Sequence, residues 1–312
     1  MIRRALWRNV RSLYRRSCMI CEKTLISMYS DKSTAPVMCL ECFFGDKWDP
    51  HSYAVDYDFS QNFFVQLKDL FSKVPRFYKY GFGNLINSEY TNYVADNKNC
   101  YLSYSTIRNE DVMYADTIED SKNSLDILGS SRLEGCYYNI DGEGNFNTHF
   151  SVKSQNCLDS YFIYDCTNSQ HCFMSCNLRS GQYYFYNQKL SKEEYQEKIK
   201  SLELDKYENV AKLKKEYDKM LDEQAIHKFA YNYNTQNTTG DYVHNAKNVK
   251  QVFDGSDIEN VSYSVRAIEV KDCMDNQGVG FNAELIYESM AATANTSNDR
   301  FCYITIQGCR DC

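Results

Sequence analysis

A seven-residue pattern of apolar and polar positions recurs every twelve residues in two parts of this chain. From residue 98 it reads KNCYLSY, EDVMYAD, KNSLDIL and EGCYYNI; from residue 247 it reads KNVKQVF, ENVSYSV, KDCMDNQ and AELIYES. A fixed short period is typical of stacked units that bury their apolar edges on one another. Alternating or aromatic-rich runs separated by Asn, Asp and Ser favour strands over helices. The predicted fold class is therefore mainly β, a parallel β-solenoid.

The third place of this pattern explains many of the fourteen cysteines. It holds Cys100, Val112, Ser124, Cys136, Val249, Val261, Cys273 and Leu285. Cysteine exchanges there with valine and serine, so the position selects a small, mostly apolar side chain, which a buried free cysteine resembles. These thiols are therefore predicted to fill the interior of the stack.

The first place alternates in charge, with Lys98, Glu110 and Lys122 in the first block. Neighbouring strands lie about 4.8 Å apart, where opposite charges attract and like charges repel. A twelve-residue coil alternates the signs, whereas a twenty-four-residue coil stacks Lys on Lys. The charges favour the shorter coil, although Tyr104 and Tyr114 would crowd its thin interior, and both lengths stay open.

Two CxxC pairs near the N-terminus predict a metal centre. Cys18, Cys21, Cys39 and Cys42 can bring four thiolates to one point, which satisfies tetrahedral zinc. Such a site has no open coordination position and is structural. Arg15, Arg16 and Lys23 can offset its negative charge, and the metal would supply folding energy to a module with few apolar residues. The alternative is four buried thiols without metal.

Residues 2–16 are predicted to form a basic helix. Arg4, Arg8, Arg11 and Arg15 recur at helical spacing opposite an apolar stripe. Two interpretations stay open: the arginines contact phosphates, as in nucleic-acid binding, or they form a solvated face of a helix packed on the zinc module.

A second helix is predicted after Ser60, its N-cap, and ends at Val74-Pro75. Its apolar positions are Phe63, Phe64, Leu67, Leu70 and Phe71. We expect this helix to cover the first coil, because an open strand edge invites aggregation.

A helical hairpin is predicted between the two repeat blocks. Ser191 and Glu194 form a capping box. Apolar residues follow at helical spacing in two segments, Tyr195, Ile199 and Leu202, then Val210, Leu213, Tyr217 and Met220. The hairpin either docks on the flank of the solenoid or is a partner-binding arm.

Composition and charge narrow the class of protein. The chain has 312 residues, 43% of them hydrophobic, and a net charge of −7. Residues 1–50 carry nine Lys/Arg and five Asp/Glu, a net of +4, so the remainder carries −11 and is a poor nucleic-acid surface. No signal peptide and no apolar run of membrane-spanning length is found, which predicts a reducing, cytoplasmic setting without a membrane partner.

Several segments of the chain are distinctive in combination: RRALWRNVRSLYRR, the CxxC pairs, DKWDP, NSEYTNY, KNCYL, NLRSGQYYFYNQKLSKEEY and TTGDYVHNAKN. Through these segments the chain resembles an uncharacterised protein family found in small uncultured bacteria and some giant viruses. The resemblance implies a zinc-ribbon-like module followed by cysteine-rich repeats, with no established biochemical role. Some members are labelled CaiB/BaiF-type CoA-transferases. The chain shows neither βαβ alternation nor a GxGxxG loop in support of that label.

Other candidate chemistry is weaker. His171 with Cys166, Cys172 and Cys176 could form a second metal site, but QNC and QHC repeat the KNC phrase, which favours packing. Solenoids can carry carbohydrate-active carboxylates, for which the candidates are Asp111, Asp116, Asp126, Asp159 and Asp165. Aspartate is also a common turn former.

We therefore predict five segments: a basic helix plus zinc-binding module at 1–58, a capping helix and linker at 59–86, a first solenoid block at 87–190, a helical hairpin at 191–230, and a second block at 231–312 that stops within a repeat. The predicted function is an intracellular interaction or scaffold protein that binds a protein partner. The alternatives are a nucleic-acid-associated protein acting through the N-terminal helix and zinc module, and a carbohydrate-active enzyme on the solenoid face.

Overall fold

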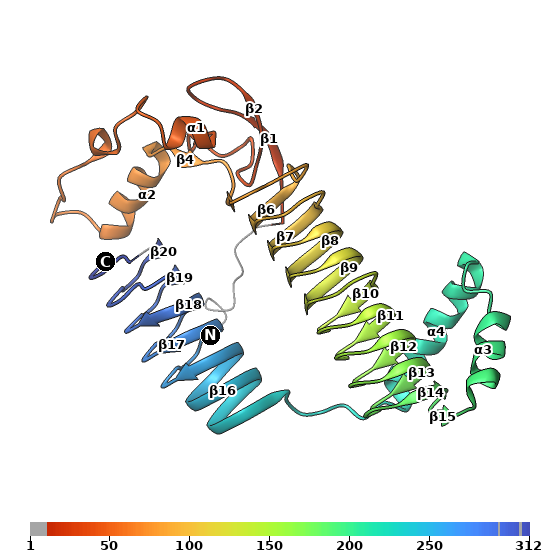
Figure 1. Cartoon of the computed structure of the whole chain (residues 1–312). Helices are drawn as coiled ribbons and strands as arrows, with labels where there is room; N and C mark the ends of the chain where they lie inside the picture. The colour runs from red at the N-terminus through yellow and green to blue at the C-terminus, as the bar shows by residue number, and fades with distance from the viewer. Residues whose placement is uncertain (1–10, 293, 306–307) are drawn as a thin grey trace. The chain divides into compact units, whose positions relative to one another are not determined.

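The computed structural model describes residues 11–292, 294–305 and 308–312 (Figure 1). The protein is mainly β, with 46% strand and 15% helix, and most strand pairs are parallel. It divides into two compact units, one through Ile226 and one comprising His227–Cys312. Prediction and structure thus agree on a mainly β fold with parallel sheets.

The first unit contains the N-terminal module, eleven paired strands and a helical hairpin. Its elements are β1 (Tyr14–Ser17), β2 (Thr24–Ser27), β3 (Val37–Met38), α1 (Leu40–Phe43), the 3-10 helix η2 (Pro50–Tyr53), α2 (Phe63–Lys73), β4 (Arg76–Phe77), β5 (Gly81–Phe82), β6 (Thr91–Ala95), β7 (Tyr101–Ile107), β8 (Glu110–Glu119), β9 (Lys122–Ser131), β10 (Tyr137–Ile140), β11 (Phe146–Val152), β12 (Leu158–Tyr164), β13 (Gln170–Cys176), β14 (Gln182–Phe185), β15 (Gln188–Lys189), α3 (Lys192–Ser201) and α4 (Tyr207–Glu223).

Strands β6 to β14 pair in parallel, and each residue faces the residue twelve positions later. Val112, for example, pairs with Ser124, and Glu110 pairs with Lys122. Isolated bridges extend the same register from Lys98 to Glu110 and from Lys122 to Glu134. The repeated phrases therefore lie directly above one another, with twelve residues per turn of this ladder.

Within each turn the backbone follows a period of three residues. Every third residue from Tyr93 to Tyr186 has a left-handed conformation, with φ between 45° and 65°. The residue after each of these points inward, and nearly all such residues are buried. Left-handed geometry is least costly for Gly, Asn and Asp, which explains why Asn and Asp recur at these corners, as at Asn99, Asp111 and Asn123.

A turn with four inward positions leaves a narrow interior, so the inward side chains are small. Cys100, Val112, Ser124 and Cys136 form one inward column and all are buried. Many inward serines form two hydrogen bonds: the Ser124 hydroxyl, for example, donates to the Lys122 carbonyl (2.7 Å) and accepts from the Cys136 N–H (3.2 Å), whereas the Ser151 hydroxyl has no partner. This reciprocal bonding allows polar residues to fill a buried core.

The alternating charges also stack as predicted. The ammonium of Lys98 lies 2.6 Å from a carboxylate oxygen of Glu110, and that of Lys122 lies 4.0 Å from the other oxygen. In the second unit, Lys247 and Lys271 flank Glu259 in the same way, at 3.3 and 3.9 Å.

The second unit repeats the parallel arrangement with β16 (Asn232–Glu259), β17 (Val265–Lys271), β18 (Gln277–Glu284), β19 (Met290–Ala292) and β20 (Tyr303–Thr305). Its register is twelve residues from Phe253 to Val265. A shift between Ile268 and Val270 lengthens the turn, and Gln277 then pairs with Met290, thirteen residues later. The unit's core is mostly aliphatic, with Val243, Val249 and Val261 among its buried residues.

The helical hairpin docks on strands β12 to β14. The Ser191–Glu194 capping box is present. Tyr217, fully buried, donates its hydroxyl hydrogen to the carbonyl of Ile163 at 2.7 Å. Tyr195, Leu213 and Met220 are buried in the same cluster. The hairpin is therefore docked on the ladder, which was the first of its two predicted arrangements.

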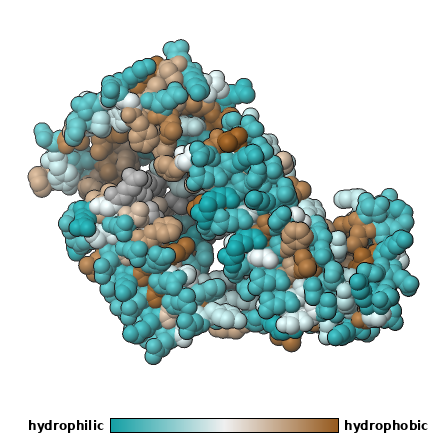
Figure 2. Space-filling model, in the orientation of Figure 1, coloured by the Kyte–Doolittle hydropathy of each residue, from teal (hydrophilic) through white to brown (hydrophobic). Residues whose placement is uncertain are grey.

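The prediction for α2 was only partly correct. Its N-cap is Asn62, which accepts from the Phe64 N–H, because the chain turns at Asp58–Gln61 before the helix begins. None of its residues is buried, and Phe63, Phe64 and Phe71 are exposed. Hydrophobic side chains accordingly gather on the surface of the N-terminal module (Figure 2). Because its apolar side chains stay exposed, α2 does not cover the first turn in the predicted way. No helix in the described residues is long and apolar enough to cross a membrane.

Candidate metal centre

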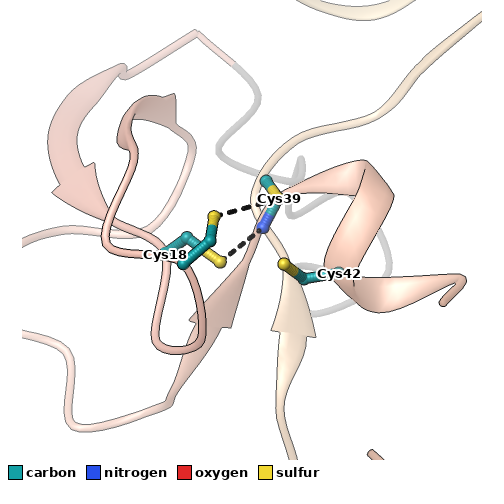
Figure 3. Close-up of side chains that lie close together, drawn as sticks. Cys18, Cys39 and Cys42 are labelled. Carbon is teal, nitrogen blue, oxygen red and sulfur yellow. Dashed lines mark hydrogen bonds between the residues drawn. The ribbon is translucent and has the colours of Figure 1, made fainter. Parts of the chain in front are cut away.

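Four cysteines of the N-terminal module converge from two short segments. Cys18 and Cys21 lie on the tight turn between β1 and β2, where the Glu22 N–H donates to the Cys18 carbonyl (3.0 Å). Cys39 is the N-cap of α1, and Cys42 lies within that helix. Figure 3 shows Cys18, Cys39 and Cys42 pointing toward one another.

The geometry suits a tetrahedral metal ion. The four sulfur atoms all lie within 4.8 Å of one another, and the Sγ atoms of Cys21 and Cys39 are 3.7 Å apart. A metal–sulfur bond of about 2.3 Å implies sulfur–sulfur separations of about 3.8 Å in a regular tetrahedron. All four cysteines are free of disulfides. The cluster can therefore bind a metal ion without large rearrangement.

The thiols do not ionise equally. Burial opposes ionisation of Cys18, but hydrogen bonds from the backbone of Cys21, Cys39 and Ile20 prevail and lower its pKa to about 6. Burial raises the pKa of Cys42, and the neighbouring thiols raise it further. Four negative sulfurs in one place require a cation, so metal binding would release protons from the remaining thiols.

A small apolar cluster supports the centre. Cys18, Leu25, Val37, Met38, Cys39 and Cys42 are buried together. Phe43 stacks against Phe77 of β4 with ring centroids 5.3 Å apart, and Trp48 donates to the Phe43 carbonyl at 2.8 Å. Since β4 follows α2 and precedes β5, these contacts connect the module to the ladder.

The predicted basic helix is wrong where the structure describes it. Tyr14–Ser17 is the strand β1, which pairs antiparallel with Thr24–Ser27, because this pairing closes the Cys18–Cys21 turn. Arg15 lies on this strand, Arg11 pairs with Asp116, and Arg16 binds the carbonyls of Ser30 and Ala35. The arginine stripe does not form at Arg11 and Arg15, while Arg4 and Arg8 lie outside the described residues.

The second set of cysteines belongs to the ladder. Cys166 and Cys172 are inward residues, and each thiol donates to the carbonyl two residues earlier, at 3.4 and 3.5 Å. The His171 ring stacks on Tyr183 with centroids 5.1 Å apart. In the part of the chain that the structure describes, only the Cys18–Cys42 group brings three or more ligand atoms this close together.

The candidate carboxylates are corner residues or are paired. Asp111, Asp126, Asp159 and Asp165 occupy left-handed corners. Asp111 and Asp159 accept hydrogen bonds from Asn99 and Asn147, at 2.8 and 2.6 Å. These carboxylates act as hydrogen-bonded turn residues in the ladder.

Sequence reasoning missed the interior asparagines. Asn109 accepts from the Ser121 N–H at 2.8 Å, and Asn145 accepts from the Cys157 N–H at 2.9 Å. In the sequence, these inward positions are marked by a small side chain at every third residue. The twelve-residue phrases do not display this shorter period.

Comparisons with known proteins add little. No protein-family model matches the chain, and no curated protein matches it significantly. A solved structure from Desulfovibrio desulfuricans, described as an acetyltransferase, aligns at 11% identity and a TM-score of 0.17. The alignment covers 70% of this chain and 66% of that chain, slightly under two thirds of its length. Similarity at this level carries no argument about fold or function.

Proposed function

We propose that this chain is a parallel β-solenoid with a structural zinc centre, and that it acts as an interaction or scaffold protein. The twelve-residue register and the inward columns support the solenoid. Four sulfurs within 4.8 Å of one another support a closed zinc site, since all coordination positions would belong to the protein. The proposal thus assigns the metal to folding and assigns binding to the ladder surface.

Metal analysis of the purified chain tests the zinc assignment. Replacing Cys39 by Ser removes one of four ligands and should abolish zinc binding at this centre. Cys100→Ser is the matched control, because Cys100 is an inward thiol in a column that already accepts Ser124. Equal zinc content in both variants would refute the assignment.

One face of the ladder carries the interaction proposal. A single register column runs through Tyr101, Met113, Leu125, Tyr137, His149, Tyr161, Phe173 and Phe185. Its neighbouring corner column holds Leu102, Tyr114, Asp126, Tyr138, Phe150 and Phe162, apolar or aromatic except for Asp126. We name the two columns together the aromatic face.

The helical hairpin covers only one half of the aromatic face. Phe162 and Phe173 are fully buried in the cluster that contains Tyr217. In the earlier turns, Tyr101, Met113 and Leu125 retain 40, 43 and 36% of their surface. Contiguous exposed apolar side chains of this kind are typical of binding surfaces. This uncovered half is the observation on which the proposed function depends.

The partner we propose is an amphipathic helix of another protein. In the covered half, α4 meets the aromatic face with Leu213, Tyr217 and Met220, which recur at helical spacing. The uncovered half continues the same columns with mostly apolar side chains, and Asp126 is its one carboxylate. A helix with a similar stripe therefore has an equivalent surface on which to pack.

Affinity capture from the native cell tests this proposal when the uncovered half is varied. Met113→Glu with Leu125→Glu places charges on it, whereas Glu134→Gln changes an exposed residue outside it. We expect a protein retained by the wild type and by Glu134→Gln but lost from the double variant. Equal retention by all three, or recovery of nucleic acid in its place, would contradict the proposal.

A further inference from the structure

The last described turns of the second unit place three cysteines on inward positions that neighbour one buried aspartate, although their ligand atoms are not drawn together as those of the N-terminal cluster are. Tyr287 pairs with Arg300, and Ser297 pairs with Arg310. This register places Cys312 directly over Asp299, thirteen residues earlier, and Cys302 follows Asp299 by one inward step of three residues. Cys309 precedes Cys312 by the same step. All four therefore occupy adjacent inward positions of a narrow interior.

Asp299 is unusual among the inward residues. It is the only Asp or Glu among the inward positions of the described ladder turns, which otherwise hold Ser, Thr, Asn, Cys or apolar side chains. It is fully buried. Its Oδ1 atom lies 3.4 Å from the Cys312 N–H, and its buried Oδ2 atom has no hydrogen-bond partner. A buried carboxylate oxygen without a partner is costly unless a cation or donor reaches it.

The three thiols differ from the other ladder cysteines in exposure. Cys273, two turns before Asp299, is buried, whereas Cys302 and Cys309 are half-buried and Cys312 is exposed. Cys309 and Cys312 also form a third CxxC pair, a spacing that suits one metal ion. Their exposure reflects their place in the last turn of the sequence, so the CxxC spacing and the partnerless oxygen of Asp299 are the features that indicate a ligand.

We propose that Asp299, Cys302, Cys309 and Cys312 bind a second zinc-type divalent cation. Three thiolates and one carboxylate supply four ligands of the kinds that zinc accepts. In the structure, Cys302 and Cys312 donate weakly to the carbonyls of Arg300 and Arg310, at 3.3 and 3.5 Å. Binding exchanges these bonds for metal–sulfur bonds: the thiols rotate toward Asp299 and release their protons as the cation enters.

Zinc stoichiometry of the full 312-residue chain tests this proposal. We expect two equivalents per chain in the wild type and the loss of one in Cys309→Ser/Cys312→Ser. Asp299→Asn keeps the shape of the side chain but removes its charge, so we expect weaker retention of the second zinc during dialysis against a chelator. Cys273→Ser is the control, since this buried thiol lies on the same ladder outside the proposed site.

The outcomes separate this site from the N-terminal centre. Cys39→Ser should remove one equivalent and leave the second, and combining it with Cys309→Ser/Cys312→Ser should remove both. A wild type with a single zinc that disappears in Cys39→Ser would overturn the second site and leave the first intact. Unchanged zinc in Cys309→Ser/Cys312→Ser, or a Cys309–Cys312 disulfide found by mass spectrometry in freshly purified protein, would also overturn it.

Discussion

The interior asparagine column offers the sharpest test of how this ladder is stabilised. Asn109 is buried, accepts from the Ser121 N–H at 2.8 Å, and donates to the carbonyls of Ile107 and Ile118. Asn109→Ala removes the acceptor, and the N–H of the fully buried Ser121 is then left unsatisfied.

The expected loss of stability in Asn109→Ala, as free energy of local opening, has two contributions. An unsatisfied buried N–H costs about 1–3 kcal/mol, and the small cavity left by the amide adds about 1 kcal/mol. The Ile107 carbonyl keeps its backbone partner, the Asp120 N–H at 3.1 Å, so its loss is smaller. The sum is roughly 2–4 kcal/mol, which corresponds to about 30- to 700-fold in a local opening equilibrium.

Native-state hydrogen exchange measures this opening directly, because amide protection reports local stability. The Ser121 amide should exchange faster in Asn109→Ala by that factor. Asn109→Ser is the matched control: in the next turn of the same column, the Ser121 hydroxyl accepts from the Leu133 N–H at 3.1 Å. Serine should therefore restore most of the protection. Equal acceleration in both variants, or none in Asn109→Ala, would refute the idea that inward acceptors stabilise the turns.

Three further predictions concern charge and docking. Burial lowers the pKa of Lys79 from 10.5 to about 8, so the unfolded chain binds more protons than the folded chain between these two pH values. The free energy of unfolding should therefore rise with pH across this window, by up to roughly 3 kcal/mol. In denaturation curves measured across the window, Lys79→Met should flatten that rise. Glu110→Lys places three positive side chains in one column and should lower the melting temperature, with added salt reducing the loss; a salt-independent loss would point to packing instead. Tyr217→Phe leaves the Ile163 carbonyl without the hydroxyl and should lower protection in α4 by about 1–2 kcal/mol, whereas unchanged exchange would show that docking is purely apolar.

Several features were readable from the sequence because they depend on residues near one another in a repeat. The twelve-residue phrases predicted which residues stack. The alternation of Lys98, Glu110 and Lys122 favoured a turn of twelve residues over one of twenty-four, and the strand register is twelve residues. Capping is equally local, and the Ser191–Glu194 box begins α3 as predicted. The CxxC spacing likewise predicted that Cys18, Cys21, Cys39 and Cys42 converge.

Other features required the tertiary structure, because they depend on which strands pair and on which surfaces a helix covers. Antiparallel pairing made Tyr14–Ser17 a strand despite its helical pattern, and Asn62 replaced Ser60 as the cap of α2. Periodicity could not show that the α4 stripe covers only one half of the aromatic face. The orphaned oxygen of Asp299 likewise emerges only when Asp299 is buried one turn from Cys312. Local patterns therefore specified the individual turns of this protein, while contacts distant in sequence decided which surfaces stay open.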